Sequence, residues 1–510
     1  MRVVDNRGLL LRVRDPQKII TAIPNSRSLG DHNVLVKWGV DESRVLRNLN
    51  VRDVPSPILG KYDWAGKYEP FEHQKTTASF LTMNRRAFCF NEQGTGKTGS
   101  AIWASDFLMK EGLILVICPL SIMDSAWRGD LFNFAMHRSV DIAYGPRKKR
   151  AEIINGNAEY IIINYDGVEI VRDEIANGGF DLIIVDEANH YKNSQSKRWK
   201  ILNALLTPDT WLWMMTGTPA AQSPVDAYGI AKLVNPKSVP RFFGAFREMV
   251  MYKVTNFKWV PKPNAKDTAF NALQPAIRFT KEQCLDLPEM TYVKREVELT
   301  SQQKKYYKEL KNEMVSVAAG EQITAVNAAV NMNKLLQISC GAVYTDTGET
   351  VEFDVKNRYK VLREAIDESS QKVLIFVPFR HAINILAEKL NKDGITNAII
   401  RGDVSAGKRT EIFKRFQDTE DPRVLIIQPQ AAAHGVTLTA ANTIVWWGPT
   451  SSLETYAQAN ARVHRSGQTH PCTVIQLQGS AVEKRIYSLL DGRIDVHSKM
   501  IDLYNEVLEM

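Results

Sequence analysis

Two segments far apart in the chain carry residues that suit phosphate chemistry. The first reads Asn91-Glu92-Gln93-Gly94-Thr95-Gly96-Lys97-Thr98, a glycine-rich turn between an apolar run and a helix-like run. In such a turn the backbone N–H groups surround a polyphosphate, the Lys97 ammonium neutralises its charge, and the Thr98 hydroxyl binds Mg²⁺. We therefore expect Gly94, Thr95, Gly96, Lys97 and Thr98 to bind a nucleotide. Asn91 replaces the first glycine of the full pattern, so a purely structural turn stays open as the alternative.

The second segment reads Gln458-Ala459-Asn460-Ala461-Arg462-Val463-His464-Arg465-Ser466-Gly467-Gln468. The sequence predicts a helix here, so that Arg462 and Arg465 share one face. Two guanidiniums on one face can stabilise the charge that develops on a transferring phosphoryl group. A solvated basic face is the alternative, but His464, Gly467 and Gln468 complete a string that is hard to obtain by accident. If both segments touch one nucleotide, it holds two domains together until hydrolysis releases them.

A pair of carboxylates, Asp186 and Glu187, directly follows an apolar run. We expect Asp186 to coordinate Mg²⁺ and Glu187 to orient or deprotonate the attacking water. A helix-capping acid pair at the end of a strand is the alternative. Roughly 90 residues separate the pair from the glycine-rich turn, which is enough for three or four βα units and places both at adjacent strand ends. This spacing favours catalysis.

Two further motifs are weak when taken alone. Gln74 lies about twenty residues before the glycine-rich turn, and its amide offers the donor and the acceptor that match the N6/N7 edge of adenine. An ordinary surface glutamine is the alternative. Thr216-Gly217-Thr218-Pro219 either couples the nucleotide site to domain movement or forms a tight turn.

The elements that must position these residues are short apolar runs that alternate with helix-like segments. Their apolar character is continuous rather than alternating, which is typical of parallel strands covered on both faces. The first set is 87–90, 113–118, 160–163, 182–185 and 211–215, and the second is 373–377, 397–400, 424–427, 443–447 and 474–477. We therefore predict an α/β protein with two doubly wound parallel-sheet lobes. In such sheets ligands bind beyond the carboxyl ends of the strands, which is where the motifs fall.

The chain is expected to divide into four parts. Residues 1–65 form a small N-terminal mixed segment, 66–236 the first lobe, 237–355 basic aromatic and helical protrusions with a linker, and 356–510 the second lobe. The protrusions have two open interpretations. The stretch 237–281 mixes Phe, Tyr and Trp with many lysines and arginines, so it is either a DNA-binding patch or a helical insert whose aromatic rings face the core of the first lobe.

Composition narrows the class of protein. The chain carries 65 Lys and Arg against 57 Asp and Glu, a net charge of +8 that permits contact with a polyanion. Its five cysteines show no CxxC spacing, which argues against zinc sites and disulfides. No apolar run is long enough to span a bilayer, and the N-terminus lacks a signal-peptide core. We expect a cytoplasmic protein of a prokaryote or a phage-infected cell, or a nuclear one if the source is eukaryotic.

The ordered motifs together resemble helicase superfamily two, and more specifically the Swi/Snf-type DNA-dependent ATPases of the chromatin-remodeller motor group. Beyond the motifs above, the segments that carry the resemblance are Cys118-Pro119-Leu120-Ser121, Leu335-Leu336-Gln337-Ile338-Ser339-Cys340 and Leu438-Thr439-Ala440-Ala441. The resemblance covers about residues 66 to 490. It implies two RecA-like lobes with helical protrusions between them, use of ATP and Mg²⁺, and movement on double-stranded DNA without strand separation.

The resemblance also implies residue roles. Gln74 would read adenine, Lys97 would act in catalysis as well as in phosphate binding, Arg462 and Arg465 would be arginine fingers, and Gln468 would contact the nucleotide. By family position the residues that contact DNA would be Ser121, Tyr165, Lys192, Arg380, Arg401, Gly402 and Thr437. Two departures stand out. Asn189 replaces a usual histidine, which is expected to affect coupling between lobes, and Ala432-Ala433-His434 replaces a glycine-rich turn.

We therefore expect an ATP-dependent translocase on double-stranded or branched DNA, acting in repair, recombination or replication in a phage-like or prokaryotic setting. Candidate partners are recombination or replication proteins, and the chain is expected to be a monomer. Two alternatives stay open. One is a strand-separating helicase of the same superfamily, and the other is an ATP-gated clamp that holds DNA without moving.

Overall fold

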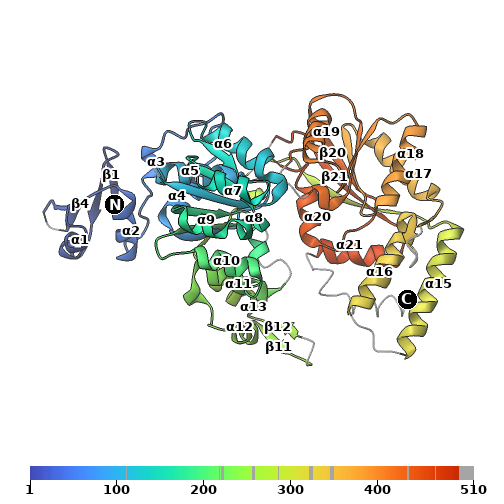
Figure 1. Cartoon of the computed structure of the whole chain (residues 1–510), viewed down its shortest axis with the longest axis horizontal. Helices are drawn as coiled ribbons and strands as arrows, with labels where there is room; N and C mark the ends of the chain where they lie inside the picture. The colour runs from blue at the N-terminus through green and yellow to red at the C-terminus, as the bar shows by residue number, and fades with distance from the viewer. Residues whose placement is uncertain are drawn as a thin grey trace. The chain divides into compact units, whose positions relative to one another are not determined.

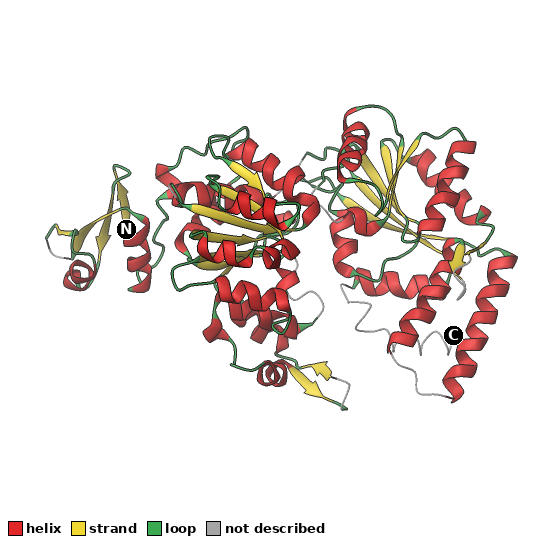
Figure 2. Ribbon diagram, in the orientation of Figure 1, coloured by secondary structure: helices red, strands yellow, loops and turns green. Residues whose placement is uncertain are grey.

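A computed structural model describes residues 1–492 except 31, 111, 218, 220–222, 256–258, 285–286, 321–324, 345–349, 433–435 and 466. The chain folds into two compact units, Met1–Cys284 and Leu285–Met510, each of which contains a parallel sheet enclosed by helices (Figures 1 and 2). The predicted α/β class with two parallel-sheet lobes is confirmed. None of the helices in the described part combines the length and the apolar character that crossing a bilayer requires.

The first unit begins with a small antiparallel sheet in the strand order β1-β2-β4-β3. Leu9, Leu11, Val34 and Val36 alternate onto one face, where they pack against α1 and α2. The bounds are β1 Arg2–Val4, β2 Gly8–Arg12, α1 Pro16–Ala22, β3 Arg27–Ser28, β4 Asn33–Lys37 and α2 Val40–Asn48. Arg47 at the end of α2 donates to the carbonyl of Met83 at 3.5 Å, which ties this small domain to the larger sheet that follows.

The main sheet of the first unit is parallel and seven-stranded, in the order β13-β5-β10-β9-β6-β8-β7. All five strand runs expected in this part of the chain are confirmed, whereas β7 and β13 were not predicted. The bounds are β5 Arg86–Cys89, β6 Leu113–Cys118, β7 Val140–Ile142, β8 Tyr160–Asn164, β9 Phe180–Val185, β10 Trp211–Met215 and β13 Ala276–Ile277.

Successive residues of these strands enter two different cores, which explains their continuous apolar character. Ile184, for example, lies in the core with α4, α5 and α6, and Val185 lies in the core with α7 to α11. The bounds are α3 Ile58–Lys61, α4 Glu72–Met83, α5 Lys97–Leu108, α6 Gly129–Phe134, α7 Arg147–Ile154, α8 Tyr165–Ile170, α9 Arg172–Asn177, α10 Lys197–Leu205 and α11 Ala227–Val234.

A protrusion follows α11 before the chain returns to the sheet at β13. It consists of α12 (Phe243–Val250), a hairpin of β11 (Met251–Lys253) and β12 (Trp259–Pro261), and α13 (Ala265–Ala272). Phe246 is fully buried in the core, as the insert interpretation expects, but Phe242 and Tyr252 are exposed. The aromatic rings of this stretch therefore divide between the core and the surface, and DNA binding by the exposed rings stays a prediction. Phe257 and Lys258 lie outside the described residues.

The second unit contains a six-stranded parallel sheet in the order β14-β21-β20-β17-β19-β18. The five expected strands are confirmed, and β14 is an edge strand that was not predicted. The bounds are β14 Met290–Glu296, β17 Lys372–Phe376, β18 Asn397–Ile400, β19 Val424–Ile427, β20 Ala441–Trp446 and β21 Cys472–Gln478.

Helices cover both faces of this sheet. Side chains of α17 and α18 pack on one face, and those of α16, α19, α20 and α21 pack on the other. The helix bounds are α15 Ser301–Gly320, α16 Ala325–Cys340, α17 Lys356–Glu368, α18 Arg380–Lys392, α19 Ala406–Asp418, α20 Leu453–Asn460 and α21 Ala481–Asp491, with a small hairpin of β15 Ala342–Tyr344 and β16 Thr350–Glu352. Elements of the expected protrusion segment 237–355 occur in both units, and the four-part division of the chain stays a prediction.

Candidate nucleotide and nucleic-acid sites

The glycine-rich turn connects the end of β5 to the start of α5, as expected for a phosphate-binding loop. Gly94 and Gly96 have φ angles of 85° and 78°, a backbone conformation that favours glycine because it has no Cβ. Gly96 is the residue before the first turn of α5, so the free N–H groups of this 12-residue helix are directed toward the loop. The loop thus has the backbone geometry and the helix N-terminus that an anionic ligand requires.

Side chains within the loop hold its shape. The Lys97 ammonium donates to the Glu92 carbonyl at 3.3 Å, and the Thr95 hydroxyl donates to the same carbonyl at 2.8 Å. Asn91, the departure from the full pattern, is buried and bonds at both ends of its amide. It donates to the Thr77 hydroxyl at 2.8 Å and accepts from the backbone N–H of Phe279 at 3.0 Å. The asparagine therefore fixes the loop to α4 and to the segment after β13.

Gln74 lies against this loop. Its amide oxygen accepts from the Phe71 N–H at 2.9 Å, and its amide nitrogen donates to the Gly96 carbonyl at 3.4 Å. A Cβ atom at Gly96 would lie 2.0 Å from that nitrogen, so any other residue at this positive-φ position would be strained and would displace the Gln74 amide. The neighbouring His73 ring nitrogen contacts the Thr95 carbonyl at 2.8 Å. The first turn of α4 thus contacts the glycine-rich loop, beside which Gln74 was predicted to act.

Asp186 and Glu187 follow β9, and buried groups hold the backbone and the side chain of Asp186 in place. The Trp127 indole N–H donates to Asp186 Oδ2 at 3.0 Å, and the Tyr165 hydroxyl donates to the Asp186 carbonyl at 2.6 Å. Glu187 has φ 49° and ψ 59°, a left-handed conformation that is strained for a residue with a Cβ. Such strain is often found at functional sites.

The carboxylate pair and the glycine-rich loop meet at one edge of the sheet. β10 lies between β5 and β9, with Met215 opposite Cys89 and Met214 opposite Val185. Two strand spacings, about 10 Å, therefore separate the starts of the two loops. Burial raises the pKa of the Cys89 thiol to about 11, while the Lys97 charge lowers it and the Asp186 charge raises it. Both charges thus act on the same buried atom.

Thr216 and Gly217 lie between these two groups at the end of β10. The Asn189 amide donates to the Thr216 hydroxyl at 3.1 Å, and Thr216 donates its N–H to the Cys89 carbonyl at 3.0 Å. A Cβ atom at Gly217 would lie 2.8 Å from Cδ of Gln93, so the phosphate loop packs directly against this turn. Thr218 lies outside the described residues.

The predicted DNA contacts of the first unit differ in exposure. Tyr165 is only 8% exposed, and its ring packs against His190 at 4.5 Å between centroids, so the side chain supports the carboxylate loop. Lys192 is half-buried and pairs with Asp226 at 3.3 Å. Ser121 is half-buried in the short helix Leu120–Ile122 that follows β6. All three lie near carboxyl ends of the parallel strands.

In the second unit, the prediction that Arg462 and Arg465 lie on a helix is wrong. α20 ends at Asn460, and both arginines belong to the turn that follows. Two carbonyls of this turn accept hydrogen bonds that are not helical. Leu438 donates its N–H to the Arg462 carbonyl at 2.9 Å, and the Gln468 amide donates to the Val463 carbonyl at 3.3 Å. Regular helical bonding therefore stops.

The same contacts build the turn into a fixed structure. Gln468 also donates to the Thr439 and Ala441 carbonyls, at 3.3 and 2.8 Å, and the Arg465 guanidinium donates to the Val436 carbonyl at 3.2 Å. Gln468 therefore positions the arginine turn relative to the loop before β20. Thr437 is exposed in that loop, and the expected departure at Ala433 and His434 lies outside the described residues.

The other predicted DNA contacts of the second unit gather at the carboxyl ends of β17 and β18. A Cβ atom at Gly402 would lie 3.4 Å from a guanidinium nitrogen of Arg380, and Arg401 pairs with Asp403 at 2.9 Å. Arg409 of α19, which was not predicted from the sequence, donates to the Gly402 carbonyl at 2.9 Å. A signal was present, since Arg409 is one helical turn inside the helix that follows Gly402.

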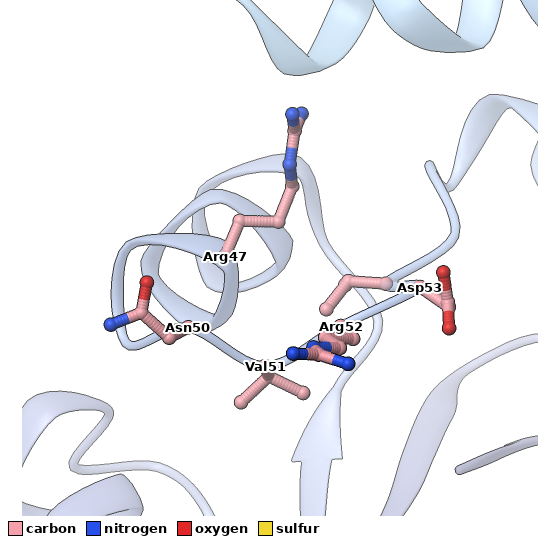
Figure 3. A pocket seen from close by; sticks show the side chains of 6 residues that line it. Arg47, Asn50, Val51, Arg52 and Asp53 are labelled. Atoms are coloured by element: carbon pink, nitrogen blue, oxygen red, sulfur yellow. The ribbon is translucent and has the colours of Figure 1, made fainter.

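Two further features bear on ligand binding: a hollow in the first unit, and the arrangement of metal-ligating side chains. A hollow at the end of α2 is lined by Arg47, Asn50, Val51, Arg52, Asp53 and Val54, and in Figure 3 the side chain of Arg47 points away from Asn50 and Asp53. It is remote in sequence from every motif above. The described residues contain no cluster of three or more metal-ligating side chains. Mg²⁺ in phosphate sites is held by one or two carboxylates together with substrate phosphates, and the Asp186 carboxylate and the Thr98 hydroxyl are oxygen donors of that kind.

Family models match most of the chain. The model described as SNF2-related domain matches residues 42–342, and the helicase conserved C-terminal domain matches residues 357–467. Among curated proteins the chain is 25% identical over 454 residues to a chromodomain-helicase-DNA-binding protein 1-like of Danio rerio, covering 83% of this chain and 43% of the relative. It is 24% identical over 429 residues to an uncharacterized ATP-dependent helicase of Mycoplasma genitalium, covering 81% and 40%.

A third relative is the SWI/SNF-related matrix-associated actin-dependent regulator of chromatin subfamily A-like protein 1 of Xenopus tropicalis, which is 25% identical over 466 residues and covers 87% of this chain and 46% of the relative. The chain thus spans about half the length of the curated relatives it matches. Among solved structures, the Sulfolobus solfataricus SWI2/SNF2 ATPase core in complex with dsDNA aligns with a TM-score of 0.42 at 21% identity, covering 88% of this chain and 95% of that chain.

Proposed function

We propose, from the premise that the chain belongs to the SNF2-related domain family and carries that family's helicase-like ATPase core, that it hydrolyses ATP and uses the energy to move along double-stranded DNA. One observation supports this most directly. The glycine-rich loop with Lys97 follows β5 and the carboxylate pair with Asp186 follows β9, and only β10 lies between these two strands of the sheet. This arrangement suits phosphoryl transfer, in which positioning and charge stabilisation supply most of the catalysis.

The residues of the first unit are assigned roles by their contacts. The N–H groups of Gly94, Thr95 and Gly96 would hold the phosphates, and Lys97 would exchange its bond with the Glu92 carbonyl for the β- and γ-phosphates. Thr98 and Asp186 would hold Mg²⁺, which when bound neutralises charge that develops on the phosphates. Glu187 would orient the attacking water, and Gln74 would read the adenine edge.

The second unit would supply the arginine fingers. Arg462 and Arg465 lie in a turn that Gln468 fixes to the neighbouring loop, so the backbone of both residues is held by a folded scaffold, and the Arg465 guanidinium bonds to the Val436 carbonyl of that loop. We propose that they contact the γ-phosphate when ATP binding closes the two lobes, and that hydrolysis removes this contact. The lobe boundaries proposed for this movement are 66–236 and 356–510, with 1–65 as an appended domain and 237–355 as protrusions and linker.

DNA would be held through its phosphates by groups near the carboxyl ends of the strands. In the second unit these are Arg380, Arg401, Gly402 and Thr437, together with Arg409 because it supports the same loop. In the first unit Ser121 and Lys192 would contact the backbone, and Tyr165 would act mainly by positioning Asp186. A role in repair, recombination or replication in a prokaryotic or phage-infected cell is part of the proposal, as is a monomeric state.

The deciding experiment measures ATP turnover against duplex, single-stranded, forked and four-way DNA at a stated salt concentration, because phosphate contacts are strongly salt-dependent. We expect DNA to raise turnover, with duplex outperforming single strands. A triplex-displacement assay then tests movement, since a static clamp leaves the third strand in place. Absence of DNA stimulation would contradict the proposal, and unwinding of a tailed duplex would favour the strand-separating alternative.

A further inference from the structure

The β11–β12 hairpin carries apolar side chains that no described part of the first unit covers. Tyr252 and Val260 face each other across the two strands and are 55% and 40% exposed, and Val254 at the end of β11 is 58% exposed. Figure 1 shows the hairpin at the end of α12, at the margin of the first unit. Exposed apolar side chains that cluster in this way mark interaction sites.

The opposite face of the hairpin is firmly attached. The Arg247 guanidinium of α12 lies 4.1 Å from the centre of the Trp259 ring, and Lys262 donates its N–H to the Val250 carbonyl at 2.9 Å. Phe246 and Val250 of the same helix are fully buried in the core. A two-stranded hairpin is marginally stable alone, so these contacts hold it in place and present Tyr252 outward from a rigid base.

The charge around the hairpin is strongly positive. Residues 241–262 contain five lysines and arginines and a single acid, Glu248. The Lys262 ammonium lies 5.1 Å from the Tyr252 ring, and the Arg241 guanidinium lies 5.3 Å from the ring of Phe242, which is 69% exposed. Within the described residues, none of Arg241, Arg247, Lys253 and Lys262 forms an ion pair, so their charge is available to an anionic partner.

We propose that this hairpin surface, defined by Tyr252, Val254, Val260 and Lys262, binds unpaired DNA by stacking a base on the Tyr252 ring while Lys262 contacts the backbone. Exposed aromatic rings beside cations are the surface that single-stranded nucleic acid requires. A base-paired duplex hides the faces of its bases, so the surface selects unpaired segments. Phe242 offers a second exposed ring before the start of α12, a helix of eight residues that is about 12 Å long.

This inference deepens the proposed function, because it adds recognition of unpaired DNA to movement on duplex DNA. It gives a physical reason for preferring forked or branched substrates, where single strands and duplex meet. Residues 241–262 carry five cations and only one acid. A protein partner with few acidic groups would leave these cations without counter-charges, which argues against such a protein as the occupant.

Binding of a short labelled oligo-deoxythymidylate, and of an abasic oligomer of the same length, tests the proposal without added nucleotide. Tyr252→Ala should weaken oligo-deoxythymidylate binding about five- to a hundredfold and leave abasic binding unchanged, because only bases stack. Tyr252→Phe keeps the ring and should bind as wild type. Tyr144→Ala is the matched control, since Tyr144 is 52% exposed with the Arg150 guanidinium 5.4 Å from its ring.

Unchanged oligo-deoxythymidylate binding by Tyr252→Ala would overturn the proposal, as would an equal loss on the abasic oligomer or in Tyr144→Ala. A change in the self-association of Tyr252→Ala by light scattering, with DNA binding intact, would assign the surface to a second copy of the chain instead. Turnover of Tyr252→Ala at saturating duplex should equal wild type. If wild-type protein shows no DNA-stimulated turnover, the proposed function fails while the oligonucleotide comparison still decides the hairpin's role.

Discussion

The Asn189 amide donates a hydrogen bond of 3.1 Å to the Thr216 hydroxyl and so joins the loop after β9 to the end of β10. Thr216 is fully buried, and its N–H bonds the Cys89 carbonyl of β5, the strand that leads into the phosphate loop. Hydrogen bonds through Thr216 therefore connect the loop that carries Asp186 and Glu187 with the strand that precedes the glycine-rich loop. The resemblance places a histidine at position 189, and in this chain the asparagine amide is the donor to Thr216.

This contact predicts that Asn189 and Thr216 act as a unit in coupling DNA binding to hydrolysis. Asn189→Ala and Thr216→Val should each lower DNA-stimulated turnover, and the double variant should show little further loss. The interaction should amount to about 1 kcal/mol, the worth of one buried neutral hydrogen bond. Asn189→His is the control, because a histidine at this position keeps a hydrogen-bond donor. Additive losses in the double-mutant cycle would show that the two side chains act independently.

Lys97→Ala should abolish ATP hydrolysis while leaving DNA affinity largely intact. The Lys97 ammonium neutralises phosphate charge in the proposed site, and Lys97 is not among the cationic residues assigned to DNA. Steady-state turnover and fluorescence anisotropy with labelled duplex measure the two effects separately. Lys75→Ala is a suitable control because that lysine, on the preceding helix, is paired with Glu72 at the protein surface. Normal turnover in Lys97→Ala would remove the loop from the active site.

Nine of the ten predicted strands lie inside a parallel sheet and therefore appear as continuous apolar runs. The tenth, β18, is an edge strand that still has two buried residues, whereas other edge strands give a weaker signal. β14 pairs only with β21 and keeps mostly exposed or half-buried side chains, and β13 is two residues long. Neither can be distinguished from a loop by hydrophobic pattern alone.

The local motifs of the site were also predictable, because loop and carboxylate residues follow strands at set places along the chain. Contacts between distant residues were not. Asn91 bonds to Phe279, 188 residues later, and the turn around Arg462 is formed by Leu438 and Gln468 rather than by helical propensity. Such contacts depend on which segments fold beside each other, which the spacing of residue types does not determine.

Removing one partner of a buried ion pair in the second unit should destabilise that unit strongly. Arg358 of α17 donates to both carboxylate oxygens of Glu483 in α21, at 2.7 and 2.9 Å, and to the Trp447 carbonyl. Removing one partner leaves an uncompensated charge in the core, so Arg358→Met or Glu483→Gln should cost about 3–5 kcal/mol of unfolding free energy. Chemical denaturation measures this. Arg363→Met, which breaks an exposed pair with Asp367 on the same helix, should cost less than about 1 kcal/mol. Similar losses in both variants would contradict the argument.

Arg465→Ala should reduce DNA-stimulated turnover about a thousandfold with only a modest loss of ATP binding, the usual result of removing an arginine finger. Its side chain is half-buried and donates to the Val436 carbonyl, so the melting temperature should change only modestly. Arg462 is only 7% exposed, so Arg462→Ala should lower both turnover and the melting temperature. Arg465→Lys keeps the charge but loses the planar fork, and should recover only part of the rate. If Arg465→Ala turns over at the wild-type rate, the guanidinium does not reach the γ-phosphate in any state of the catalytic cycle.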